Sequence, residues 1–255
     1  MSSSNLPSTA PSHGHPAKDL QQPLTNSSTN PPSTSSHRPR SNPDPTTSNA
    51  SQTPQGSLTA TPPTRPPELA RLEVTLRSAL RQYPDFPSPG ILFEDIMPLF
   101  VSPALHEDLI HALHLLVTHY VTSQKIDVVV GLESRGFLFG PSLALRLGAA
   151  FVPVRKKGKL PGPCETEGFQ KEYGADEFQM QSDAIKPGQR VVIVDDIIAT
   201  GGSAAAAGKL VRKLGGDLLA FAFLMELDFL KGRDKLDAPV HTLFAGQEEA
   251  LSSTR

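Results

Sequence analysis

The 255-residue chain has a single cysteine, Cys164, and so cannot form an intramolecular disulfide. This favours a reducing compartment, and we expect a cytoplasmic protein, with the nucleus as an alternative location. The chain also lacks an excess of positive charge, because 24 basic and 26 acidic residues give a net charge of -2. It therefore offers no overall basic field, and we expect neither nucleic acid nor a membrane surface among its partners.

Long apolar segments are missing as well. No apolar run could span a bilayer, and the amino terminus lacks the apolar core of a secretory signal. Residues 1–66 are dominated by Ser, Thr, Pro, Asn and Gln and contain no aromatic residue, so they cannot bury enough apolar surface to offset the entropy of ordering. We predict a disordered tail over residues 1–66, one domain over 67–246 and a flexible tail over 247–255.

Two common phosphate-binding motifs are also absent. No Gly-Lys-Ser/Thr follows a glycine loop, which argues against a P-loop, and no Gly-x-Gly-x-x-Gly indicates a dinucleotide fold. The chain instead contains a run from Val191 to Ser203 in which four aliphatic residues precede two acids and then Ala-Thr-Gly-Gly-Ser. The aliphatic residues predict a parallel strand buried on both faces, and the acids then lie at the sheet edge where ligands bind.

The small residues after this strand are suited to a phosphate group. A helix is predicted from Ser203 to Leu214, so its amino-terminal loop comprises Ala199, Thr200, Gly201, Gly202 and Ser203. Backbone N–H groups, two hydroxyls and the helix dipole would favour an anion there. Asp195 and Asp196 would repel phosphate and are suited to ribose hydroxyls or to waters on a magnesium ion. The alternative is an ordinary turn with a solvated acid pair.

A second strand, loop and helix follow the same plan. Residues 126–130 predict another buried strand, and Gly131-Leu-Glu-Ser-Arg-Gly follows it at the same sheet edge. Arg135 in this loop and the basic segment 155–159 supply positive charge of the kind that binds pyrophosphate. A solvated basic surface is the alternative interpretation of the segment.

The run containing both acids resembles the phosphoribosyl pyrophosphate (PRPP) signature of type I phosphoribosyltransferases. Four further stretches have the order and spacing found in adenine phosphoribosyltransferases: residues 86–93, 131–141, 155–162 and 172–174. This resemblance covers about residues 68–245. It implies an α/β fold, a doubly wound parallel sheet with a small hood or lid, and a homodimer.

The resemblance also implies a reaction in which adenine and PRPP give AMP and pyrophosphate, with Mg2+ held mainly through PRPP and water. The 5-phosphate would lie in loop 199–203, and Asp195 and Asp196 would bind the ribose hydroxyls. The pyrophosphate would be neutralised by four cationic side chains: Arg135, Arg155, Lys156 and Lys159. Phe93 would stack on the adenine ring, and main-chain groups of Leu92 would bind its edge.

The same resemblance places Glu172 and Tyr173, with Arg135, among the catalytic residues. Glu172 and Tyr173 would belong to a loop that closes over the reacting centre. Glu172 would act there as a general acid or base on the purine, or would be a solvated carboxylate of the lid. The chain departs from the family pattern at Glu94, where some members have Arg, and at Phe169 and Lys171 before the lid motif.

Two other functions remain as alternatives. A 6-oxopurine phosphoribosyltransferase, acting on hypoxanthine, guanine or xanthine, would need a donor such as Lys for the 6-oxo group. A non-catalytic PRPP-sensing regulator would keep the phosphate loop without turnover. Such regulators usually add a DNA-binding module, whereas this chain adds a low-complexity tail.

Further elements are expected to build the core around these motifs. Helical spacing of leucines predicts one helix over residues 68–80 and a second that begins at Ser102 and Pro103. The second helix has four histidines, which we expect at the surface rather than in a metal site. Residues 218–227 predict a strand and 231–235 a polar turn, whereas 174–185 show no clear periodicity and are expected to pack near the lid.

Overall fold

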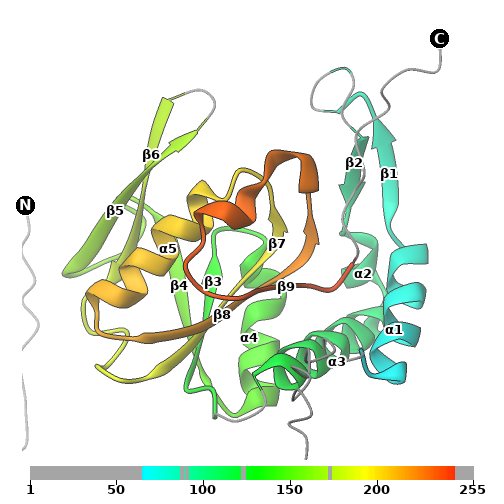
Figure 1. Ribbon diagram of the computed structural model, residues 1–255, viewed down its shortest axis with the longest axis horizontal. Helices are drawn as coiled ribbons and strands as arrows, with labels where there is room; N and C mark the ends of the chain where they lie inside the picture. Colours follow the sequence, from blue (N-terminus) through cyan, green and yellow to red (C-terminus); the bar gives the residue numbers. More distant parts are fainter. Residues whose placement is uncertain (1–64, 87–88, 90–91, 122–124, 172–173, 245–255) are drawn as a thin grey trace, which may run out of the picture. The chain divides into compact units, whose positions relative to one another are not determined.

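The computed structural model describes residues 65–86, 89, 92–121, 125–171 and 174–244. Their centre is a seven-stranded sheet with the strand order β5-β6-β4-β3-β7-β8-β9 (Figure 1). Five strands are parallel: β3 (Val128–Leu132), β4 (Ala150–Lys156), β7 (Arg190–Ile198), β8 (Asp217–Glu226) and β9 (Val240–Thr242). An antiparallel hairpin of β5 (Cys164–Lys171) and β6 (Gly174–Gln181) continues the sheet beyond β4.

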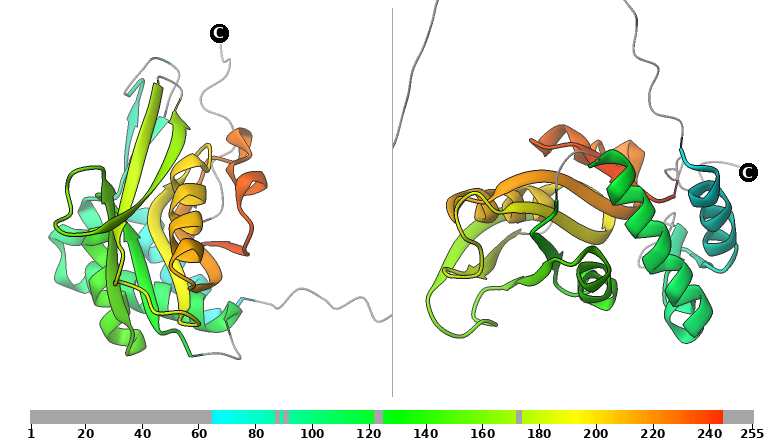
Figure 2. Two further views of the ribbon diagram at one scale, coloured as in Figure 1. Left: turned by 90° about the vertical axis from the view of Figure 1, so that its left-hand side faces the viewer. Right: turned by 90° about the horizontal axis from the view of Figure 1, so that it is seen from below.

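Helices cover both faces of this sheet. Figure 2 shows α3 (Pro103–Tyr120) and α4 (Gly136–Leu147) on one face and α5 (Gly202–Lys213) on the other. Within β7, Val192 and Val194 belong to the core under α3 and α4, and Ile193 belongs to the core under α5. The predicted doubly wound α/β fold is therefore confirmed, and the aliphatic run is buried on both faces as predicted.

The predicted helix beginning at Ser102 is also confirmed. The Ser102 Oγ accepts a hydrogen bond from the Leu105 N–H at 3.3 Å, and Pro103 occupies the first turn. This is the usual N-cap arrangement, in which a hydroxyl satisfies a helix N–H that has no partner within the helix. The four histidines of α3 are partly buried, so the expectation that they lie at the surface holds only in part.

A smaller subdomain lies before α3 in the chain. The helix α1 (Pro67–Ser78) buries three leucines against α3, and α2 (Pro98–Val101) is a single short turn. Between them β1 (Arg81–Pro84) and β2 (Leu92–Asp95) form an antiparallel pair. Among the helices of the described ranges, none combines the length and apolarity that crossing a membrane requires.

The expectation for residues 174–185 was wrong, because most of this segment is the strand β6. Its side chains Phe178 and Met180 are buried in the core that includes α5, two residues apart as strand geometry requires. Only this short alternation indicated a strand, since the rest of the segment up to Ala184 is polar or small. Residues 228–230 and 232–235 form the short 3-10 turns η1 (Asp228–Leu230) and η2 (Gly232–Lys235), in agreement with the predicted polar turn.

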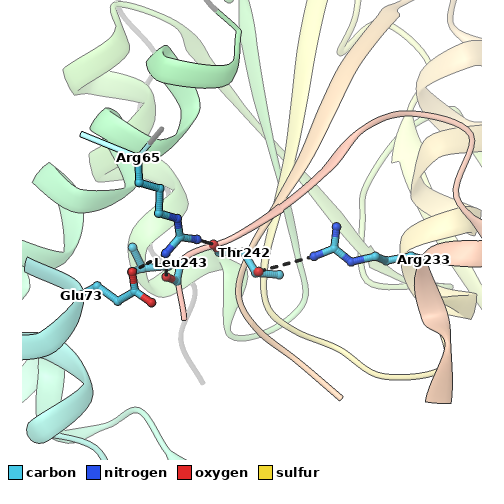
Figure 3. A network of polar contacts seen from close by, with 5 residues as sticks. All are labelled: Arg65, Glu73, Arg233, Thr242 and Leu243. Carbon is cyan, nitrogen blue, oxygen red and sulfur yellow. Dashed lines mark hydrogen bonds and ion pairs between the residues drawn. The ribbon is translucent and has the colours of Figure 1, made fainter. Parts of the chain in front are cut away.

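Arg65 fastens the start of α1 to the far edge of the sheet. Its guanidinium donates to the carbonyl oxygens of Thr242 at 2.5 Å and Leu243 at 3.2 Å, and it forms an ion pair with Glu73 (Figure 3). Arg65 belongs to the segment that the sequence assigned to the tail. The folded part of the chain therefore includes this residue.

Replacing Arg65 with alanine is expected to lower the free energy of unfolding by about 1–2 kcal/mol, because two carbonyls and a carboxylate lose a charged donor at a partly exposed site. Urea unfolding measures this change. Arg71→Ala is the matched control, since Arg71 lies on the exposed side of α1. Equal losses in both variants would show that the Arg65 contacts contribute nothing.

Candidate active site at the sheet edge

The two predicted loops leave neighbouring strands in opposite directions. β3 pairs with β7, with Val130 opposite Ile193 and Gly131 opposite Val194. After β3 the chain passes through α4 to β4 on one side, and after β7 it passes through α5 to β8 on the other. Such a reversal of strand order is where ligands bind in doubly wound sheets, outside the carboxyl ends of the strands.

An ion pair joins the two loops. Arg135, the residue before α4, donates from Nε to Asp196 Oδ2 at 2.8 Å, and the Asp196 side chain is only 5% exposed. Asp195 lies beside it on β7, and its Oδ1 is buried without a hydrogen-bond partner in the described part of the chain. A buried carboxylate oxygen normally has a donor, so this atom marks a position for a ligand hydroxyl or a water.

The environment of these two acids changes their titration. Removal from water raises the pKa of Asp195 well above its ordinary value, and the neighbouring Asp196 carboxylate adds to the effect. Removal from water also raises the pKa of Asp196, although the guanidinium of Arg135 acts in the opposite direction. Such perturbed acids at a sheet edge are typical of functional sites.

Asp195 and Asp196 lie within β7 rather than after it, and the loop that follows Ile198 leads into the amino terminus of α5. Gly201 is the N-cap of this helix, with φ 75°, and in the described chain no side chain caps the helix. The first N–H groups of a helix have no acceptor within it, and here they belong to the turn that starts at Gly202 and includes Ser203. Together with the helix dipole they form an anion-binding position. Residues 199–203 thus lie at the start of α5, as the sequence predicts, and their binding of phosphate stays a prediction.

Arg155 and Lys156 of the basic segment 155–159 lie beside carboxylates of the same chain. Arg155 donates to Glu133 through Nη2 at 2.8 Å and Nε at 3.3 Å, and the Lys156 N–H donates to the same carboxylate at 3.0 Å. The Arg155 guanidinium holds the pKa of Glu133 below its ordinary value. The Lys156 ammonium lies 3.8 Å from Asp176, whereas Lys159 is exposed.

Glu133 is a residue of this site that the sequence did not indicate. Its carboxylate connects the loop after β3 to the end of β4, so it sets where the basic segment starts. The only sequence signal was an acid two residues before Arg135 in the same loop. Among the predicted pyrophosphate ligands, Arg135 therefore lies beside the acid pair, and Arg155 is held by a different acid.

Leu92 and Phe93 lie on β2 in the small hairpin. The Phe93 ring contacts Phe86 edge to face, with ring centres 5.1 Å apart. On the same hairpin Gln82 donates to Glu94 at 3.1 Å, and Glu94 is only 9% exposed.

Both hairpins, β1–β2 and β5–β6, extend beyond the carboxyl ends of the parallel strands in Figure 1. Glu172 and Tyr173 fall between β5 and β6 and lie outside the described residues.

Comparison with known proteins identifies the family. A model of the phosphoribosyl transferase domain matches residues 103–250. The adenine phosphoribosyltransferase of Debaryomyces hansenii is 59% identical over 186 residues, which are 73% of this chain and 98% of that protein. Adenine phosphoribosyltransferase 1 of Saccharomyces cerevisiae is 61% identical over 176 residues, or 69% and 94% of the two chains. The chain belongs to the adenine phosphoribosyltransferase family.

A solved structure agrees with this family and with the fold. It is the crystal structure of the Saccharomyces cerevisiae adenine phosphoribosyltransferase complexed with D-2,5-dideoxy-2,5-imino-altritol 1,6-bisphosphate and adenine. The TM-score is 0.67 at 60% identity, and the match covers 69% of this chain and 99% of that chain. The resemblance to the adenine phosphoribosyltransferase family noted in the sequence is therefore confirmed.

Proposed function

We propose that this protein is a purine-salvage enzyme that transfers the 5-phosphoribosyl group of PRPP to adenine, giving AMP and pyrophosphate. The observation that carries the proposal is the meeting of three features at one sheet edge. Within the described residues these are a helix amino terminus without a side-chain cap, an acid with an oxygen that has no hydrogen-bond partner, and the Arg135–Asp196 pair. Family membership supports it, and so do the adenine and the bisphosphate bound by the yeast enzyme of 60% identity.

The chemistry explains the placement of charge. The bond from ribose C1 to pyrophosphate breaks, and a bond from C1 to a purine nitrogen forms. While the first bond is largely broken and the second is not yet complete, the ribosyl group is cation-like. Backbone N–H groups of α5 hold the 5-phosphate, and the two acids accept hydrogen bonds from the ribose hydroxyls. Arg135, fixed by Asp196, together with Lys156 and Lys159 stabilises the negative charge that develops on the departing pyrophosphate.

The adenine ring is assigned to the small hairpin. Phe93 stacks on the purine, and main-chain groups of Leu92 bind its edge. Glu172 and Tyr173 close over the reacting centre and exclude water that would compete with the purine. Glu172 is also the candidate for handling the purine proton.

The residues of this site fit a magnesium ion that binds together with PRPP. Within the described ranges, no cluster of three or more His, Cys, Asp or Glu side chains could hold a metal ion. Mg2+ is commonly bound through one or two carboxylates, several waters and substrate phosphates, and the free Oδ1 of Asp195 offers such an oxygen. When bound, the ion would neutralise part of the pyrophosphate charge, held mainly through PRPP and water, with Asp195 and Asp196 contacting those waters.

The raised pKa of Asp195 predicts a pH dependence of ligand binding. A carboxyl with a raised pKa is protonated as the pH falls towards that value, and its neutral form is the weaker acceptor for ribose hydroxyls. We expect the affinity for ribose 5-phosphate to fall with decreasing pH more steeply in the wild type than in Asp195→Asn. Both proteins experience the titration of the ligand phosphate, so calorimetry of the pair measures the effect of the Asp195 carboxyl together with its influence on Asp196. A constant ratio of affinities from about pH 8 to about pH 5 would contradict this assignment.

The direct test of the proposed function is product formation by the purified full chain with adenine, PRPP and Mg2+. AMP and pyrophosphate in equal amounts are expected. Binding of PRPP without any product would instead favour the sensing regulator. A parallel reaction with EDTA tests the magnesium requirement, since loss of turnover is expected only when the metal is removed.

Two further properties are part of the same proposal. We place the reaction in the cytoplasm, because a single cysteine suits a reducing compartment. We also propose a homodimer, as the family resemblance implies, and the exposed apolar side chains of Leu138 and Leu145 on α4 are consistent with burial against a second copy. Light scattering during size-exclusion chromatography measures the assembly.

A further inference from the structure

The turn after β8 lies against the phosphate loop. Glu226 ends β8 opposite Ile198, the last residue of β7, and the Leu227 N–H donates to the Ile198 carbonyl at 2.9 Å. The chain then passes through η1 and reverses at Lys231, which has φ 49°. This reversal brings the backbone of Gly232 onto the backbone of the loop that follows β7.

The contact leaves no room for a side chain on either side. A Cβ added at Gly232 would lie 2.2 Å from the Ala199 carbonyl oxygen and 3.0 Å from the Gly201 nitrogen. A Cβ added at Gly201 would lie 2.3 Å from the Gly232 carbonyl oxygen. Gly232 does not have a positive φ, so space rather than backbone conformation requires glycine at this position.

Arg233 holds this turn in place. Its Nε donates to Glu226 at 2.5 Å, and Nη1 donates to the Val240 carbonyl at 2.6 Å. Its Nη2 lies 3.5 Å from Thr242 Oγ, the contact drawn in Figure 3. The Glu226 side chain is only 6% exposed, so one arginine ties the turn both to the end of β8 and to β9.

We propose that Gly232 and Arg233 are positioning residues for the 5-phosphate of PRPP, although neither belongs to the phosphate loop. The backbone of Gly232 packs against residues 199–201 and limits where they can lie. The Arg233–Glu226 ion pair fixes the distance between this turn and the phosphate loop. The loop then presents its N–H groups in one arrangement. This inference rests on the PRPP site of the proposed function and extends it to a segment that the sequence indicated only as a polar turn.

Gly232→Ala tests the close contact between Gly232 and the phosphate loop directly. The added methyl group must displace the loop by about 1 Å to reach normal contact distance, so we expect at least about a tenfold rise in the Kd of ribose 5-phosphate, measured by calorimetry. The KM for PRPP is expected to rise with it, whereas the KM for adenine stays at the wild-type value. Gly168→Ala is the control, because a Cβ there has its nearest neighbour at 4.0 Å.

If Gly232→Ala does not fold, a second set of variants tests whether the turn positions the phosphate loop. Arg233→Gln removes the ion pair, and Arg233→Lys restores a charge for Glu226 without the second donor to Val240. We expect ribose 5-phosphate affinity to decrease in the order wild type, Arg233→Lys, Arg233→Gln. Lys235→Gln is the control on the same turn, since Lys235 is exposed. A merely structural role would lower the thermal midpoint without separating the two KM values.

The outcomes separate this inference from the proposed function. Wild-type affinity for ribose 5-phosphate in folded Gly232→Ala and Arg233→Gln would overturn the positioning role. Wild-type protein that binds ribose 5-phosphate but forms no AMP would overturn the proposed reaction instead, and the expected weakening in the variants would still support the positioning role.

Discussion

Replacing Asp196 with asparagine is expected to lower kcat/KM for PRPP by about a hundredfold to a thousandfold, because the charge that fixes Arg135 at the reacting centre is lost. Asparagine keeps the volume of the side chain, so the buried surroundings of residue 196 change little. It loses the negative charge that holds the guanidinium at 2.8 Å and that accepts a ribose hydroxyl in the proposed complex. Steady-state kinetics with varied PRPP measures the effect.

Asp237→Asn is the matched control for this change. Asp237 also forms a 2.8 Å ion pair with an arginine, Arg212, but its side chain is 63% exposed and it lies after η2, away from the acid pair. We expect wild-type activity from this variant. Similar kcat/KM values for Asp196→Asn and Asp237→Asn would remove Asp196 from the site.

The second large effect is expected at Gly201, where Gly201→Ala should weaken ribose 5-phosphate binding by about a hundredfold. Two physical causes act together. The residue has φ 75°, which costs an L-residue about 1–2 kcal/mol, and the new Cβ would lie 2.3 Å from the Gly232 carbonyl oxygen. The loop that forms the amino terminus of α5 must therefore shift.

Gly188→Ala separates these two causes. Gly188 has φ 80°, but a Cβ built there meets no atom of the described residues within 4 Å, so the variant carries the backbone strain without the clash. We expect it to lose stability and keep its affinity for ribose 5-phosphate. If Gly201→Ala lost no more affinity than Gly188→Ala, the close contact of the phosphate loop with Gly232 would have no role in binding.

Local signals made much of the fold predictable from the sequence. Four consecutive aliphatic residues predict the buried strand that becomes β7, and Ser102 before Pro103 predicts the start of α3. The phosphate loop was predictable for the same reason, because small residues, a strand and a helix follow one another within residues 191–214. These elements depend on neighbours in the chain. The structure keeps the predicted helices with shifts of one or two residues at the ends, whereas β7 continues past Val194 through both acids to Ile198.

Contacts between distant residues were not predictable in this way. The pairing of Arg155 with Glu133 joins residues 22 positions apart, and nothing in either local pattern indicates it. The contact of Gly232 with the phosphate loop depends on a turn that follows β8, whereas the phosphate loop follows β7. The strand β6 was missed because only Phe178 and Met180 mark its buried face.

Some of the assignments stay predictions. The roles of Glu172 and Tyr173 concern residues outside the described ranges, as do the predicted tails apart from Arg65 and Pro66. The contacts of Leu92 and Phe93 with adenine rest on their place in the small hairpin and on the resemblance to the family. Kinetics of Glu172→Ala and Phe93→Ala would address these roles separately from the phosphate site.

The most direct measurement is the initial rate of nucleotide formation with PRPP and Mg2+ and, side by side, adenine, hypoxanthine, guanine and xanthine, each product being identified by chromatography. We expect that adenine is converted to AMP and that the three oxopurines are not used. Turnover of an oxopurine in place of adenine would contradict the assignment of the adenine pocket to Leu92 and Phe93, and no turnover with any base would contradict the proposed reaction itself.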